Sequence, residues 1–135
     1  MDASDIRIMI VEDDELEREA LAALLAGRGY RISQAANGLE ALMQLRASGG
    51  TDLIVLDMAM PVMDGWRFLA EKMKDPVLMP IKVIVLSGYE FPAPQLFSSL
   101  VEAFLRKPLE LDTLLGTIQR IAAESAAASN KTWLS

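Results

Sequence analysis

Residues 52–66 read DLIVLDMAMPVMDGW, in which an apolar run from Leu53 to Leu56 stops abruptly at the acid Asp57. A short unbroken apolar run with β-branched residues is typical of a strand buried on both faces, as in a parallel sheet. Asp57 would then stand at the carboxyl end of that strand. Asp64 and Gly65 are turn residues, and they predict the start of a helix that ends near residue 74.

Further apolar segments alternate with segments of helical period along the rest of the chain. The predicted strands cover residues 6–11, 30–35, 52–57, 81–87 and 103–106. Strands that alternate with helices predict an α/β fold, in which a doubly wound parallel sheet carries helices on both faces. In such sheets ligands bind beyond the carboxyl ends of the strands.

Glycine, asparagine and proline mark where the predicted helices begin and end. The first helix is expected to end at Gly27 and Gly29, and Asn37 is the predicted N-cap of the second. Prolines at 92 and 94 allow at most a short helix within 94–101. One face of the first helix is expected to carry Leu16, Ala20, Leu21, Leu24 and Leu25.

The last helix carries an apolar stripe from Leu111 to Ile121, and the stripe is lost beyond it. We therefore expect one domain over residues 1–121, of a size typical for a single compact unit. Residues 122–135 are expected to form a helix end, a tail or a linker.

The composition excludes several kinds of chemistry. The chain has no cysteine and no histidine, so thiol and histidine nucleophiles are absent and a metal site must be built from oxygen ligands. An excess of 19 acids over 13 bases argues against direct nucleic-acid binding. No unbroken apolar stretch reaches the roughly 18 residues of a membrane helix, and the acidic N-terminus is unlike an export signal. We expect a cytoplasmic protein.

Polar side chains follow four of the predicted strands. Glu12, Asp13 and Asp14 end the first strand, Asp57 the third, Ser87 the fourth, and Lys107 follows the fifth. Each residue also has a purely structural interpretation, and Asp14 is as well suited to capping the next helix as to binding. Their conjunction at one edge of the sheet predicts a functional site.

The segments IMIVEDD, DLIVLDMAMPVMDGW, VIVLSG and FLRKP occur in this order within residues 6–121. Together they resemble the receiver domain of two-component response regulators. The resemblance implies a flavodoxin-like (βα)5 fold with strand order 2-1-3-4-5. It also implies that a phosphoryl group passes from a histidine of a partner to an aspartate of this chain.

Carried over by the resemblance, Asp57 is the phosphoacceptor. Glu12, Asp13, Asp57 and the backbone carbonyl of Ala59 would hold Mg²⁺ or Mn²⁺. A hard divalent cation would relieve the repulsion among these acids and bridge to a phosphoryl oxygen.

The resemblance also assigns Ser87 as the switch hydroxyl and Lys107 as the cation that pairs with Asp57 and the phosphoryl oxygens. Phe104 matches an aromatic residue that turns inward on activation, although an ordinary core aromatic is the alternative. The bond between Lys107 and Pro108 matches a cis peptide. Phosphorylation would then change the surface made by the fourth helix, the fifth strand and the last helix.

Two positions depart from the usual pattern of the family. Ala59 lacks the polar side chain that is common there, and Tyr89 is bulky. In the family these two positions influence how water reaches the phosphoryl group, so the resemblance implies slow self-dephosphorylation.

The resemblance implies a sensor histidine kinase or a histidine phosphotransfer protein as the phosphoryl donor. The downstream target is not specified by the sequence, and no membrane partner is expected. The prolines at 92 and 94 are expected to shorten or displace the fourth helix, which in the family usually contributes to the dimer surface. We therefore expect a monomer or a weak phosphorylation-dependent dimer.

Other functions fit the sequence less well. The first alternative is a receiver-like interaction module that acts without phosphorylation, but the complete set of Glu12, Asp13, Asp57, Ser87 and Lys107 argues against it. A phosphohydrolase of the haloacid dehalogenase type would need a second acid at position 59, where the chain has alanine. A nucleotide-binding protein would need a glycine-rich loop after the first strand, which is missing.

Overall fold

The computed structural model describes residues 5–58, 63–88 and 100–134, with side chains as far as Ser125. Five parallel strands form one sheet in the order β2-β1-β3-β4-β5, which confirms the predicted fold class and strand order. The strands are β1 (Arg7–Val11), β2 (Arg31–Ala35), β3 (Leu53–Asp57), β4 (Lys82–Ser87) and β5 (Ala103–Arg106).

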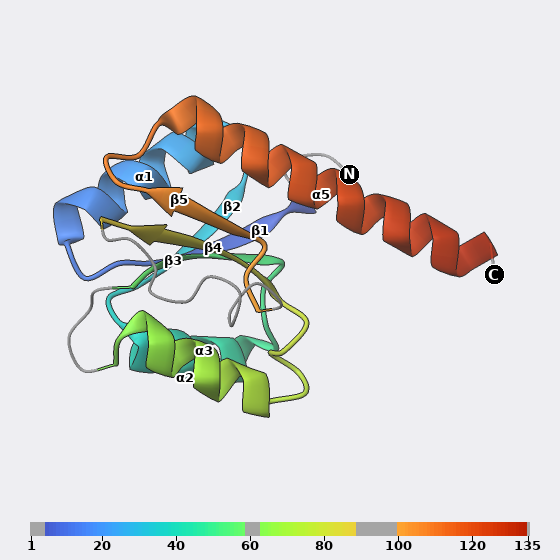
Figure 1. Cartoon of the computed structure of the whole chain (residues 1–135), viewed down its shortest axis with the longest axis horizontal. Coiled ribbons are helices and arrows are strands. Elements are labelled where there is room, and N and C mark those ends of the chain that lie inside the picture. Colours follow the sequence, from blue (N-terminus) through green and yellow to red (C-terminus); the bar gives the residue numbers. More distant parts are fainter. Residues whose placement is uncertain (1–4, 59–62, 89–99, 135) are drawn as a thin grey trace.

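Helices cover both faces of this sheet. In Figure 1, α1 and α5 lie on one side of the strands, and α2 and α3 lie on the other. The four helices are α1 (Glu15–Gly27), α2 (Gly38–Ser48), α3 (Gly65–Lys74) and α5 (Leu111–Leu134). Within the described part of the chain, none of the helices combines the length and hydropathy that a membrane span requires.

The unbroken apolar run of β3 is explained by its central place in the sheet. Leu53 and Val55 pack in the core cluster that includes residues of α1 and α5. Ile54 and Leu56 pack in the cluster that includes residues of α2 and α3. Because successive side chains of a strand point to opposite faces, a strand covered on both sides needs an apolar residue at every position.

Side chains cap the helices that lead away from the carboxyl edge. Asp14 accepts a hydrogen bond from the Glu17 amide at 3.0 Å, and Asn37 accepts one from the Glu40 amide at 2.9 Å. Asp64 caps α3 in the same way. The structural role of Asp14 and the predicted cap at Asn37 are both confirmed.

The predicted apolar face of α1 is wrong in part. Leu25 is buried and Leu21 is half-buried, but Leu16 and Leu24 are 80% and 48% exposed. The side of α1 that meets the sheet instead includes Ala22, which is buried. The spacing of the leucines predicted an apolar face that is rotated around the helix axis from the face that packs against the sheet.

The last helix continues to Leu134, so residues 122–134 are helical in backbone. In Figure 1, its C-terminal turns extend past the sheet. The division of the chain into residues 1–121 and 122–135 stays a prediction. Most of the segment expected to hold a short fourth helix, within 94–101, lies outside the described residues.

Candidate functional site

The site is built at the carboxyl edge of the sheet, where β1 and β3 are neighbours. Asp57 is the last residue of β3 and is only 6% exposed. Glu12 directly follows β1 and is 7% exposed, whereas the next residue, Asp13, is exposed. The pairing of Val11 with Leu56 brings these acids side by side.

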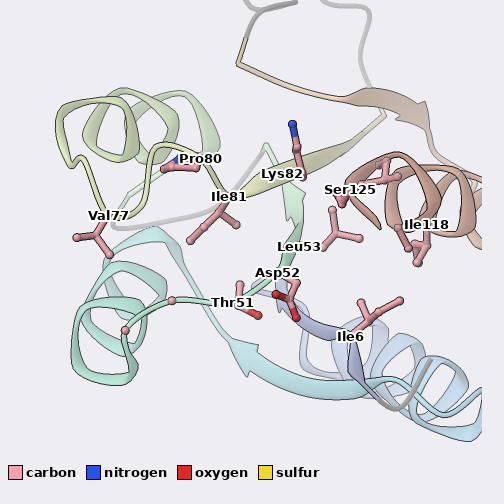
Figure 2. A pocket seen from close by; sticks show the side chains of 14 residues that line it. Ile6, Thr51, Asp52, Leu53, Val77, Pro80, Ile81, Lys82, Ile118 and Ser125 are labelled. Carbon is pink, nitrogen blue, oxygen red and sulfur yellow. The ribbon is translucent and has the colours of Figure 1, made fainter. Parts of the chain in front are cut away.

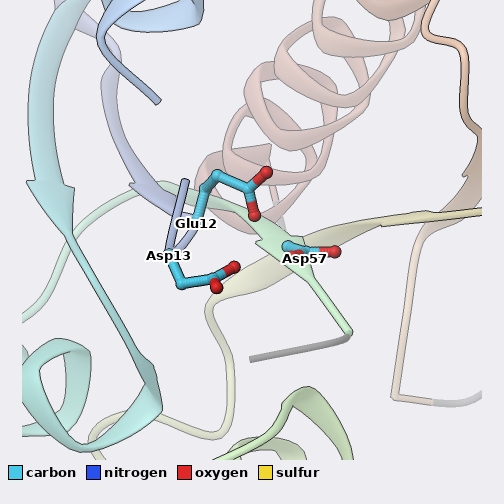
Figure 3. Close-up of side chains that lie close together, drawn as sticks. All are labelled: Glu12, Asp13 and Asp57. Atoms are coloured by element: carbon cyan, nitrogen blue, oxygen red, sulfur yellow. The ribbon is translucent and has the colours of Figure 1, made fainter. Parts of the chain in front are cut away.

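The three carboxylates converge. One oxygen from each of Glu12, Asp13 and Asp57 lies within 4.8 Å of the others, and Figure 3 shows the three side chains close together. Oxygen ligands at such spacing are those that Mg²⁺ and Mn²⁺ prefer.

Lys107 completes the cluster from the other side. Its Nζ lies 3.1 Å from Oε1 of Glu12, 3.4 Å from Oε2 of Glu17 and 3.6 Å from Oδ1 of Asp57. The backbone amide of Lys107 donates to the carbonyl of Ser87 at 2.9 Å, which fixes the start of this loop against β4. The peptide bond between Lys107 and Pro108 is cis.

Burial and mutual repulsion shift the pKa values of this cluster. Burial, together with the neighbouring carboxyls of Asp57 and Glu17, raises the pKa of Glu12 from 4.5 to about 9. The hydrogen bond with Glu12 and the charge of Lys107 lower the pKa of Glu17. Although burial opposes its charge, hydrogen bonding to Glu12 and the charge of Asp57 hold the pKa of Lys107 above its ordinary value.

One atom of the cluster tests whether a cation fits. Oε2 of Glu12 is buried and has no hydrogen-bond partner among the described residues. A buried carboxylate oxygen without a partner is costly, and a bound cation would satisfy it. The residues present therefore fit a hard divalent ion, because they supply a buried acceptor and two further acids.

Ser87 and Phe104 lie on the neighbouring strands β4 and β5. Ser87 ends β4 and is 4% exposed. Phe104 on β5 is opposite Val85, two residues before Ser87, and it is partly buried against the core cluster of α2 and α3. A side chain in this place is consistent with both the switch and the core interpretation of Phe104. Ala59 and Tyr89 lie outside the described residues.

The turn after Asp57 is tightly packed. The amide of Gly65 donates to the carbonyl of Met58 at 3.1 Å. A Cβ atom on Gly65 would come within 2.8 Å of the Met58 Cα and would also collide with its sulfur. Only glycine therefore allows α3 to begin this close to the end of β3. Trp66 follows and packs against the core cluster that includes residues of α2 and α3.

Two residues at the start of α1 belong to the site but are not evident from the sequence. Glu17 contacts Lys107, and Arg18 donates to the Glu12 carbonyl at 2.8 Å and to the Gln34 side chain at 3.2 Å. In the sequence, Glu17 and Arg18 could be linked to the site only because they lie in the first turn of the helix that directly follows the acids.

Cavities distinguish the two edges of the sheet. A groove of about 350 Å³ runs beside the carboxylates between α1 and the loop at Lys107, and Leu21, Leu24 and Leu109 line it. A second cavity of about 340 Å³ lies at the opposite edge of the sheet, near Ile6, Asp52 and Lys82 (Figure 2). Glu12, Asp13 and Asp57 do not line it.

The sequence of this chain is similar to those of known proteins. The chain is 36% identical over 117 residues to the sensor kinase CckA of Brucella abortus, covering 84% of this chain and 12% of that protein. It is 34% identical over 115 residues to an uncharacterized response regulatory protein of Vibrio cholerae, covering 84% and 47%. The chain thus spans less than half the length of these two curated relatives.

Solved structures of response regulators are similar in fold to this chain. A putative response regulator from Chloroflexus aurantiacus has a TM-score of 0.78 at 27% identity, covering 87% of this chain and 98% of that one. The response regulator TrrA of Thermotoga maritima, solved in complex with Mg²⁺-BeF, has a TM-score of 0.74 at 32% identity and covers 86% and 98%. The family model of the response regulator receiver domain matches residues 8–119, and the chain belongs to this family.

Proposed function

We propose that this receiver domain accepts a phosphoryl group on Asp57 and thereby switches a signalling surface. The observation that carries the proposal is the convergence of Asp57 with Glu12, Asp13 and Lys107 at one edge of the sheet. The donor would be a phosphohistidine of a sensor histidine kinase or of a histidine phosphotransfer protein.

In the transfer, an oxygen of the Asp57 carboxylate attacks phosphorus while the bond from phosphorus to the donor's histidine nitrogen breaks. The nitrogen keeps the electron pair, and the product is an acyl phosphate. Because Asp57 attacks as a carboxylate, no general base is required. Positioning and electrostatics supply most of the catalysis of such a step.

Glu12, Asp13, Asp57 and the Ala59 carbonyl would hold Mg²⁺ or Mn²⁺. When bound, such an ion neutralises acidic charge and stabilises the oxygens of the transferring group. Lys107 contributes positive charge from the opposite side, since its Nζ is already 3.6 Å from Asp57. We propose that the domain in this way catalyses its own phosphorylation and its slow dephosphorylation.

The phosphorylated state carries nearly two negative charges and new acceptor oxygens. We expect the Ser87 hydroxyl to move and donate to one of them. The space it leaves would admit the ring of Phe104, which lies on the adjacent strand. Such a movement would couple the site to the surface formed around β5 and α5.

A direct test uses Mg²⁺ with acetyl phosphate, followed by intact mass. In parallel, beryllofluoride binding is followed by Trp66 fluorescence in a Trp133→Phe background, since the chain has two tryptophans. Asp57→Asn should abolish the added mass and the fluorescence change. Asp52→Asn is the matched control, because Asp52 is exposed and pairs with Arg7 at the opposite edge.

The competing function is an interaction module that works without phosphorylation. That function would be favoured if Asp57 gained no phosphoryl mass and the mimic produced no metal-dependent signal. The intact acid cluster and the pairing with Lys107 support the phosphoacceptor instead.

A further inference from the structure

Lys107 is shared among three carboxylates, and one of them has no part in the transfer described above. Glu17 lies in the first turn of α1, and its Oε2 is 3.4 Å from the Lys107 Nζ. That distance is shorter than the 3.6 Å between Lys107 and Asp57. Glu17 therefore contacts the same ammonium group that the phosphoryl oxygens would need.

The backbone places Glu17 there. Asp14 accepts a hydrogen bond from the Glu17 amide at 3.0 Å, which fixes the first turn of α1. Arg18 donates to the Glu12 carbonyl at 2.8 Å and ties the same turn to the end of β1. Residue 17 is thus held at the mouth of the site by two contacts that do not involve its own carboxylate.

The three carboxylates differ in how easily they can release Lys107. A lysine ammonium has three N–H donors, and Glu12, Glu17 and Asp57 surround it. The Glu12 and Asp57 side chains are 9% and 8% exposed, whereas that of Glu17 is 59% exposed. Water can solvate the Glu17 carboxylate when it separates from Lys107. A phosphoryl oxygen can therefore replace Glu17 at a lower cost in free energy than it can replace Glu12 or Asp57.

We propose that Glu17 is a positioning residue that competes with the phosphoryl group for Lys107 and so weakens the phosphorylated state. This inference rests on the proposed function of Asp57. Glu17 also places a negative charge near the incoming dianion, which acts in the same direction. The wild-type chain thereby keeps Lys107 on the α1 side of the site until a phosphoryl group displaces Glu17.

The expected effect is modest, because the Glu17 contact is exposed. Ion pairs at exposed positions change equilibria by roughly twofold to fivefold. Glu17→Gln should tighten beryllofluoride binding in saturating Mg²⁺ by about that factor. The affinity for Mg²⁺ alone should not increase, because a released Lys107 competes with the cation for the same carboxylates.

The experiment measures both affinities by Trp66 fluorescence in the Trp133→Phe background. Glu19→Gln is the matched control, because Glu19 is exposed on the same helix and its replacement changes the net charge equally. Rates of phosphorylation by acetyl phosphate are also compared in a Lys107→Ala background, where Glu17→Gln should keep only the part of its effect that comes from direct charge repulsion.

The outcomes separate the two proposals. If the Trp133→Phe protein with an otherwise natural sequence does not respond to beryllofluoride, the function proposed for Asp57 fails. If it responds but Glu17→Gln and Glu19→Gln behave alike, the role of Glu17 is overturned and the function of Asp57 stands. The role is equally overturned if Glu17→Gln has its full effect without Lys107, since Glu17 would then act only through its charge.

Discussion

Replacing Lys72 by methionine should invert the stability difference between variant and wild type as the pH rises. Lys72 lies in α3 and is only 5% exposed, and its Nζ donates to the carbonyl of Met79 at 2.7 Å. Burial, followed by the charge of Lys82, lowers its pKa from 10.5 to about 8, and Glu102 partly opposes this shift. Methionine keeps an unbranched side chain and removes the charge.

The magnitude follows from the pKa difference between the folded and unfolded states. At pH 7 both states hold the proton, and a shift from 10.5 to about 8 means that the charged amine costs the fold about 3 kcal/mol. Above pH 8 the folded state loses the proton first, so stability rises with pH. By pH 9.5 the cost of burying the Lys72 amine has fallen by about 2 kcal/mol.

The variant also loses the hydrogen bond to the part-buried carbonyl of Met79, and leaving this carbonyl without its donor costs about 1–2 kcal/mol. Lys72→Met should therefore match or exceed the stability of the wild type at pH 7 and fall below it at pH 9.5. Urea unfolding at both pH values measures the change. Lys74→Met is the control on the same helix, because that side chain is 71% exposed. A difference between Lys72→Met and wild type that is equal at both pH values would refute the reasoning.

Three further predictions concern the site. Binding of Mg²⁺ at pH 7 should release a proton, because the pKa of Glu12 is raised to about 9 in the metal-free protein. Titration calorimetry in two buffers of different ionisation enthalpy measures the number of protons released. Binding of Mg²⁺ to the Glu12→Gln variant should release no proton. Gly65→Ala should destabilise the fold by about 1–3 kcal/mol in urea unfolding, because its Cβ would meet the Met58 backbone, whereas Gly116→Ala, with open space around it, should stabilise α5. Ala59→Asn should shorten the phosphoryl lifetime followed by intact mass, and an unchanged lifetime would contradict the expectation that Ala59 slows dephosphorylation.

The sheet and the acidic part of the site were predictable because they depend on local pattern and on topology. Unbroken apolar runs marked β1, β3 and β4, and parallel strands necessarily bring Glu12 and Asp57 to one edge. The order of the strands needed the family resemblance, since the apolar runs do not distinguish one parallel order from another.

Other features depend on how the elements pack, which the sequence does not state locally. The contact between Glu17 and Lys107 joins residues 90 positions apart and requires the rotation of α1 against the sheet. That same rotation leaves Leu16 and Leu24 exposed. Lys72 resembles a surface lysine in the sequence, and only the approach of Met79 reveals it as buried.

The length of α5 has a different cause. Residues 122–135 lack an apolar stripe, so packing gave no reason to extend the helix beyond Ile121. The segment is nevertheless rich in alanine, which has the highest intrinsic helix propensity. Propensity alone can continue a helix that packing has already started.

The length of α5 also magnifies any change in its direction. The helix begins at Leu111, four residues after Lys107, and its 24 residues span about 36 Å at 1.5 Å per residue. A tilt of about 5° at the first turn, if the helix stays straight, would move the far end by about 3 Å. A small change in the direction of α5 near the carboxylates would therefore become a movement of about a hydrogen-bond length at Leu134.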